Sequence, residues 1–207
     1  MSHYVKFTYQ CARSDVVLFS GLPELNACRQ KLLERHLLGV DSDGVGFGNL
    51  SVRDGATRNF YITGSATGEL PSLTPADCVR VVEYDFAKNW LSYEGASIPS
   101  SESLTHAAIY ESDPTICAVI HCHDSDLWRT LLDRVPTTSK TVVYGTPEMA
   151  YEIIRLFRTS DVRNSEILVM GGHESGIVTF GKNLQDAFEV LMRERSESSP
   201  CIGRRFS

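Results

Sequence analysis

The sequence predicts a mixed α/β domain whose sheet is at least partly antiparallel. Stretches with apolar residues at helical spacing alternate with short runs of β-branched and aromatic residues. Several of these short runs follow one another across glycine-rich turns, which is typical of antiparallel pairs. A chain of 207 residues with 42% hydrophobic residues can bury a substantial core. We therefore expect one globular domain over residues 1–207.

The first half of the chain predicts one helix and several strands. Proline suits the first turn of a helix over residues 23–38, its leucines keep helical spacing, and Gly39 is placed to end it. A short strand is expected before it, over residues 16–19. Glycine-rich loops surround a predicted hairpin, and a further strand pair follows. These four runs cover residues 50–53, 59–63, 79–85 and 89–95.

The second half predicts helices that alternate with strands. Two of the strands are joined by a glycine-rich turn that carries His173. Asn183 is a good N-cap for the last helix, whose apolar residues recur at helical spacing. The predicted helices cover residues 101–111, 125–132, 147–158 and 184–195. The predicted strands cover residues 115–123, 141–144, 165–170 and 176–180.

The composition argues against some classes of binding partner and indicates a cellular compartment. A formal net charge of -6, with 20 dispersed Lys and Arg residues, argues against binding to nucleic acid or to an anionic membrane. No apolar run approaches the roughly 20 residues that span a bilayer, and residues 1–10 lack the apolar core of a secretion signal. We expect a cytoplasmic protein. Its six cysteines form no CxxC pair and are expected to be reduced.

Two histidines at the end of one predicted strand suggest a metal site. Because side chains alternate along a strand, His121 and His123 point to the same side, about 6–7 Å apart, while Cys122 faces away. This pattern alone also fits one packed and one solvated histidine. If His173, from the turn of another strand pair, joins them, three imidazoles would bind one metal ion and leave one of its coordination positions open. Such a set suits zinc, and other divalent transition metals are possible.

The sequence Ser100-Ser101-Glu102 begins the predicted helix 101–111 and has two interpretations. Serine followed by glutamate is an ordinary helix start that satisfies free backbone amides. Alternatively, the hydroxyls and free amides bind a phosphate, which the helix dipole favours. Asn49, Thr67 and Gly68 could complete such an anion pocket, although turn formation explains the glycine equally well.

Taken in order, these motifs resemble the class II aldolase and adducin head domain family. The similarity covers about residues 21–192, which we take as the core of the domain. The segments that match the family are residues 48–53, 61–63 with the following glycine loop, 99–102, 118–123, and Gly172-His173 with the segment after it. The resemblance implies a three-layer α/β/α fold around a central, largely antiparallel sheet. It also implies a homotetramer with active sites at the subunit boundaries.

The resemblance also implies roles for the candidate residues. His121, His123 and His173 match the zinc ligands of the family, and Glu102 matches its catalytic acid/base. The phosphate-binding positions of the family correspond to Asn49, Thr67, Gly68, Ser100 and Ser101. The implied function is a zinc-dependent aldolase, a carbon–carbon lyase that acts on a small sugar phosphate through an enediolate.

Two alternatives remain open at this stage. An epimerase or dehydratase could use the same scaffold, although epimerases of the family carry aspartate in place of Glu102. A non-catalytic assembly domain like the adducin head should have lost metal ligands, and this chain keeps all three. Where the aldolases have a proton-donating tyrosine, this chain has Lys140 or Thr141, so proton transfer at the departing aldehyde is unassigned.

Overall fold

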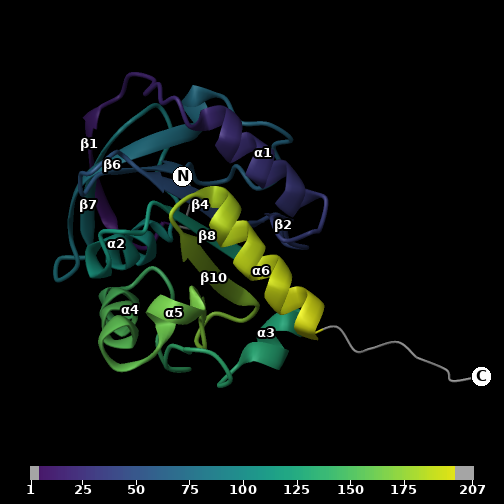
Figure 1. Ribbon diagram of the computed structural model, residues 1–207. Coiled ribbons are helices and arrows are strands. Elements are labelled where there is room, and N and C mark those ends of the chain that lie inside the picture. Colours follow the sequence, from purple (N-terminus) through teal and green to yellow (C-terminus); the bar gives the residue numbers. More distant parts are fainter. Residues whose placement is uncertain (1–4, 199–207) are drawn as a thin grey trace, which may run out of the picture.

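An eight-stranded sheet lies at the centre of the molecule (Figure 1). The computed structural model describes residues 5–198, and the structural statements below refer to these residues. The strand order is β1-β7-β6-β5-β4-β8-β10-β9, and every neighbouring pair is antiparallel except β1 with β7. The strands are β1 (Thr8–Arg13), β4 (Asn49–Arg53), β5 (Phe60–Thr63), β6 (Cys78–Asp85), β7 (Trp90–Glu94), β8 (Ala118–His123), β9 (Ile167–Val169) and β10 (Gly176–Gly181). A separate short hairpin joins β2 (Gly39–Val40) to β3 (Gly46–Phe47).

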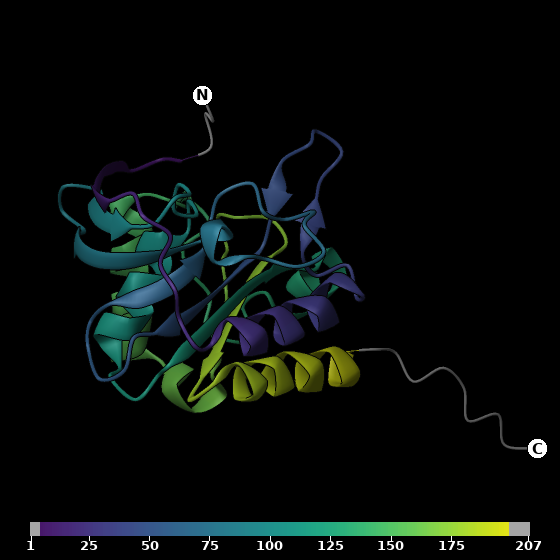
Figure 2. The same cartoon turned by 90° about the horizontal axis from the view of Figure 1, so that it is seen from above.

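Helices cover both faces of this sheet, and each face has its own apolar cluster. On one face α2 packs against α4, and on the other α1 lies beside α6 (Figures 1 and 2). The helices are α1 (Leu22–Leu33), α2 (Ser103–Ser112), α3 (Ser125–Leu131), α4 (Pro147–Thr159), α5 (Val162–Ser165) and α6 (Leu184–Ser198), with a short 3-10 helix η1 (Pro75–Asp77). The arrangement confirms the predicted α/β/α fold class with a largely antiparallel sheet. Within the described residues, no helix is both long and apolar enough to cross a membrane.

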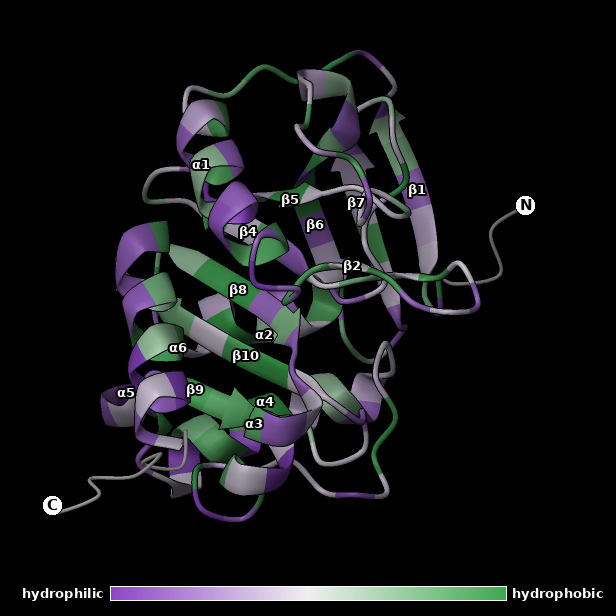
Figure 3. Ribbon diagram, turned by 90° about the vertical axis from the view of Figure 1, so that its right-hand side faces the viewer, coloured by the Kyte–Doolittle hydropathy of each residue, from purple (hydrophilic) through white to green (hydrophobic). Residues whose placement is uncertain are grey.

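The strands β8, β10 and β9 are apolar because helices cover both of their faces. All six residues of β10 and all three of β9 are buried, and both strands are largely hydrophobic in Figure 3. In β8, Ala118, Ile120 and Cys122 pack in the cluster of α1 and α6. Val119 belongs to the cluster of α2 and α4. This alternation confirms that Cys122 faces away from His121 and His123.

The register of the sheet brings the predicted site residues to one place. His121 lies opposite Val178 of β10 on one side and opposite Asn49 of β4 on the other. Directly opposite residues of an antiparallel pair point to the same face. The Asn49 side chain therefore lies beside His121, although 72 positions separate the two residues in the sequence.

Three predicted elements differ from those observed. The first helix ends at Leu33, before the predicted position, and His36 then takes a left-handed conformation with φ 56°. Residues 16–19 form no strand, and β1 lies earlier in the chain. Residues 141–144 also form no strand, because the backbone of Val142 packs closely against Gly172 instead of joining the sheet.

Arg29 of α1 fastens the loop of Thr67 and Gly68 to the body of the protein. Its guanidinium is almost fully buried, with 2% of the residue exposed. It donates hydrogen bonds to the carbonyl oxygens of Thr67, Gly68 and Leu70. Hydrogen bonds from a charged donor are stronger than neutral ones. Arg29 therefore links the packing of α1 to the position of a predicted anion-binding loop.

We predict that Arg29→Met destabilises the protein by about 2–4 kcal/mol, because three buried carbonyl groups lose their charged donor. Denaturant titration would measure the change in the free energy of unfolding. Lys31→Met replaces a half-buried cation on the same helix, whose ammonium group bonds the exposed Gln185 side chain, and should change the free energy much less. Equal stabilities of the two variants would show that Arg29 does not hold the loop.

Candidate metal centre and active site

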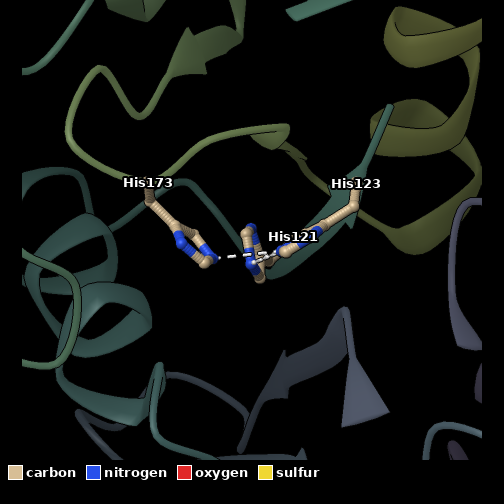
Figure 4. A group of neighbouring side chains, drawn as sticks. All are labelled: His121, His123 and His173. Carbon is tan, nitrogen blue, oxygen red and sulfur yellow. Dashed lines mark hydrogen bonds between the residues drawn. The ribbon is translucent and has the colours of Figure 1, made fainter. Parts of the chain in front are cut away.

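Three histidine side chains converge where β8 meets the turn between β9 and β10 (Figure 4). His121 and His123 come from β8, and His173 comes from the turn. The Nε2 atom of His123 lies 3.2 Å from Nε2 of His121 and 3.1 Å from Nε2 of His173. The candidate ligand atoms all lie within 4.8 Å of one another. The predicted triad is therefore assembled in space.

The geometry and chemistry of this triad fit a divalent transition metal. Two nitrogen ligands at about 2.0–2.1 Å from a tetrahedral ion lie about 3.3 Å apart, close to the separations observed here. Nδ1 of His121 donates to the carbonyl oxygen of Ile177 at 3.2 Å, which leaves its Nε2 lone pair facing the other two rings. Three imidazoles without a thiolate suit zinc or a related ion.

Burial keeps the three imidazoles in the neutral form that binds metals. Burial lowers the pKa of His123 to about 4 and that of His173 to about 3. The pKa of His121 lies well below its usual value, mainly because of burial and then because of the two neighbouring histidines. Near pH 7 each ring is therefore neutral, with one nitrogen lone pair free to bind a metal.

The backbone of the turn holds His173 over β8. A side chain at Gly172 would begin 1.9 Å from the carbonyl oxygen of Val142, so only glycine allows the turn to lie this close. Ser175 takes a left-handed conformation with φ 69°. Trp128 of α3 packs beneath the turn, and its Nε1 donates to the carbonyl oxygen of Met170 at 3.0 Å. These contacts hold the turn so that His173 stays within reach of the other two histidines.

Glu102 places a buried carboxyl group in the same cavity. It is the N-cap residue of α2, and only 3% of it is exposed. Its Oε2 accepts a hydrogen bond from the Thr105 hydroxyl at 2.7 Å, whereas Oε1 has no partner among the described residues. Burial raises the pKa of Glu102 to about 7, although the Thr105 bond and the charge of Lys6 act in the opposite direction. Such a carboxyl group can both accept and donate a proton near neutral pH.

The five predicted anion-binding residues line the same cavity, whose volume is about 200 Å³. Ser100 is buried, Ser101 is partly buried, and both directly precede the N-cap of α2. Asn49 is buried, and its Oδ1 has no partner within residues 5–198. Thr67 donates its hydroxyl to the Gly64 carbonyl oxygen at 2.9 Å, which is a loop-forming contact. Gly68 follows it in the loop that Arg29 holds.

Two aromatic rings in the cavity wall were not among the predicted site residues. Phe47 stacks on His123 with ring centroids 5.1 Å apart, and Tyr144 lies against His173 at 4.2 Å. Asp41 also lines the cavity, near His123. The only local signal was that Phe47 and Tyr144 each precede a glycine. Because their contacts join distant segments, spacing in the sequence could not reveal them.

Comparison with known proteins identifies related sequences and folds. The profile of the "Class II Aldolase and Adducin N-terminal domain" family matches residues 33–193. A 3-oxo-tetronate 4-phosphate decarboxylase from Pectobacterium atrosepticum is 28% identical over 171 residues, which are 75% of this chain and 73% of that protein.

Solved structures of sugar phosphate aldolases share the fold. An L-fuculose 1-phosphate aldolase superposes with a TM-score of 0.66 at 24% identity, over 87% of this chain and 84% of the other. The L-fuculose-1-phosphate aldolase of Thermus thermophilus gives a TM-score of 0.61 at 19% identity, over 86% and 90% of the two chains. At these identities the superpositions establish the fold alone.

We predict that the purified protein binds about one zinc ion per chain and that His173→Ala loses this binding, since two imidazoles hold zinc weakly. Metal analysis after dialysis against zinc would measure the stoichiometry, and zinc should raise the melting temperature of the wild type but not that of His173→Ala. His36→Asn is a matched control, because His36 lies outside the triad and asparagine tolerates its positive φ. Full zinc content in His173→Ala would exclude His173 as a ligand.

We also predict that Glu102→Gln stabilises the metal-free protein at alkaline pH. Because the pKa of Glu102 in the folded state is raised from 4.5 to about 7, its contribution is present below pH 4.5 and is lost as the pH rises through 7. At pH 8 the variant should exceed the wild type by up to about 3 kcal/mol, and near pH 4 the difference should vanish.

Denaturant titrations at both pH values would test this, with the exposed Glu148→Gln as the control. A constant difference between Glu102→Gln and the wild type at the two pH values would contradict the raised pKa.

Proposed function

Because the chain belongs to the class II aldolase and adducin N-terminal domain family, we propose that it is a metal-dependent carbon–carbon lyase acting on a small sugar phosphate. The observation that carries this proposal is the meeting of three neutral imidazoles and a buried carboxyl group in one cavity. A non-catalytic assembly domain would have no need to keep both. The proposed metal is zinc, with other divalent transition ions as substitutes.

Each group of residues has a proposed task. His121, His123 and His173 would hold the metal, which when bound supplies a Lewis acid that stabilises the negative charge of a substrate enediolate. Glu102 would move a proton at the carbon beside the substrate carbonyl, and its pKa of about 7 suits transfer in both directions. Because Glu102 is buried in the cavity, this proton transfer would be shielded from bulk water.

The phosphate would be held by the wall that Asn49, Thr67, Gly68, Ser100 and Ser101 form. Neutral hydroxyl, amide and backbone donors can bind a phosphate without a fixed charge, and the start of α2 adds its dipole. The Oδ1 of Asn49 has no partner among the described residues and could accept a hydrogen bond from a substrate hydroxyl, while the Nδ2 group of the same amide would donate to the phosphate. Binding at this wall would fix the distance between the reacting carbons and Glu102.

Two bond-breaking reactions fit this constellation, aldol cleavage and decarboxylation of a 3-oxo acid. Both leave an enediolate that Glu102 can protonate. The similarity to the Pectobacterium atrosepticum decarboxylase favours the second reaction. Carbon dioxide leaves without a proton transfer of its own, so this reaction needs no counterpart of the aldolase tyrosine, whose aligned positions here hold Lys140 or Thr141.

Assembly and location form part of the same proposal. We propose a cytoplasmic homotetramer whose active sites lie at subunit boundaries. Exposed apolar side chains support an interface between copies, since Val16 and Leu18 are 46% and 76% exposed in the chain by itself.

We predict that the zinc-loaded protein turns over a member of a panel of phosphorylated ketoses and phosphorylated 3-oxo sugar acids. Product analysis would detect an aldehyde after aldol cleavage, carbon dioxide after decarboxylation, and an isomer or water loss after epimerisation or dehydration. Removing the phosphate should lower kcat/KM by about 100-fold or more, because binding energy from the phosphate is lost. Equal turnover of the phosphorylated and unphosphorylated substrates would contradict the proposal that this wall binds the phosphate.

On the best substrate, Glu102→Gln should lower kcat by about 100- to 10,000-fold while the zinc content stays at the wild-type level. Glu148→Gln serves again as the exposed control. Unchanged turnover in Glu102→Gln would show that another group moves the proton.

A further inference from the structure

Arg29 of α1 lies behind the loop that carries Thr67 and Gly68. These two loop residues line the cavity, whereas Arg29 does not. The guanidinium group donates hydrogen bonds to the carbonyl oxygens of Thr67, Leu70 and Gly68, the last at 3.0 Å. The loop therefore separates the guanidinium group from the cavity.

The contacts with Arg29 set the direction of the loop amides. In a trans peptide unit the C=O and N–H groups point in opposite directions. Because the carbonyl group of Thr67 points to Arg29, the N–H of Gly68, in the same peptide unit, points away from it. The N–H groups of Ala66, Thr67 and Gly68 have no hydrogen-bond partner within residues 5–198. Ala66 has φ 59°, and a left-handed residue in a turn helps successive N–H groups to converge on an anion.

The hairpin of β2 and β3 holds the same loop from another side. A Cβ added to Gly68 would overlap the carbonyl oxygen of Gly39, so only glycine allows this approach. A Cβ added to Gly46 would lie 3.5 Å from the Gly68 nitrogen, and Gly46 also lines the cavity. The Gly68 amide is therefore fixed at the cavity wall, between the hairpin and the contacts with Arg29.

The charge of Arg29 has no carboxylate in contact with it. Only 2% of the residue is exposed, and none of the ion pairs formed within residues 5–198 includes it. The nearby carboxylate of Asp77 instead accepts hydrogen bonds from Thr74. A guanidinium stays protonated, and burying it without a counterion is unfavourable. Since none of the described cavity-lining residues is a lysine or an arginine, Arg29 is a buried positive charge behind a wall that has none of its own.

We propose that Arg29 is a positioning residue for the substrate phosphate. It turns the amides of the Thr67–Gly68 loop towards the phosphate, and its charge attracts the phosphate from behind the loop. This inference rests on the proposed function, because it needs the phosphate at that wall. Arg29 does not touch the phosphate, so its effect passes through the loop backbone and through the electrostatic field.

The test measures the binding of inorganic phosphate to the full chain by calorimetric titration, once with zinc bound and once with the metal removed. Arg29→Met should weaken the binding by about 10- to 100-fold in both forms, because the charge and the orientation of the amides are lost. Arg29→Lys keeps the charge but cannot bond three carbonyl groups with one planar group, so it should weaken the binding by only about 3- to 10-fold.

Leu25→Ala is the matched control for a general loss of stability. Leu25 is fully buried on the same helix, and its truncation leaves a cavity while the Arg29 contacts remain. This variant should bind phosphate within about twofold of the wild type. The melting temperature and zinc content of each variant would show that it is folded, and Arg29→Lys decides the question if Arg29→Met does not fold.

An unchanged phosphate affinity in the Arg29 variants, or an equal loss in Leu25→Ala, would overturn this inference alone. A loss confined to the zinc-loaded protein would also overturn it, because the phosphate would then lie on the metal. If the wild type binds no phosphate in either form, the proposed phosphate wall is wrong as well.

Discussion

The pairing of β8 between β4 and β10 is the constraint on which the rest of the site depends. This register sets His121 beside Asn49 on one side and Val178 on the other, and it leaves His123 at the strand end, facing the turn that carries His173. A slip of one residue would turn both histidines into the cluster of α1 and α6 and would bring Cys122 to the cavity. The cluster of α1 and α6 opposes that slip, because it would have to accommodate two polar imidazoles in place of Ile120 and Cys122. Packing on one face of β8 therefore fixes the positions of the histidine side chains on the other face.

Burial gives the groups of the site the protonation states that the proposed chemistry needs. The same low-dielectric surroundings lower the pKa values of His123 and His173 and raise that of Glu102. Neutral imidazoles can bind a metal, and a carboxyl group with a pKa near 7 can transfer protons. Burying Glu102 with no partner for Oε1 among the described residues costs stability, which fits the proposal that this carboxyl group serves chemistry and not folding. Arg29 and Trp128 offset part of this cost by fastening the loops that surround the cavity.

The sequence by itself determined the fold class, most of the elements and the candidate residues, because these depend on local patterns. Alternation along residues 118–123 fixed the common face of the two histidines, and the order of the motifs indicated the family. Local patterns failed where contacts between distant segments decide the conformation. Residues 141–144 read as a strand, but their backbone packs against the His173 turn. Only the tertiary structure brought Tyr144 and Phe47 to the cavity, since each packs there against a histidine from a distant segment of the chain.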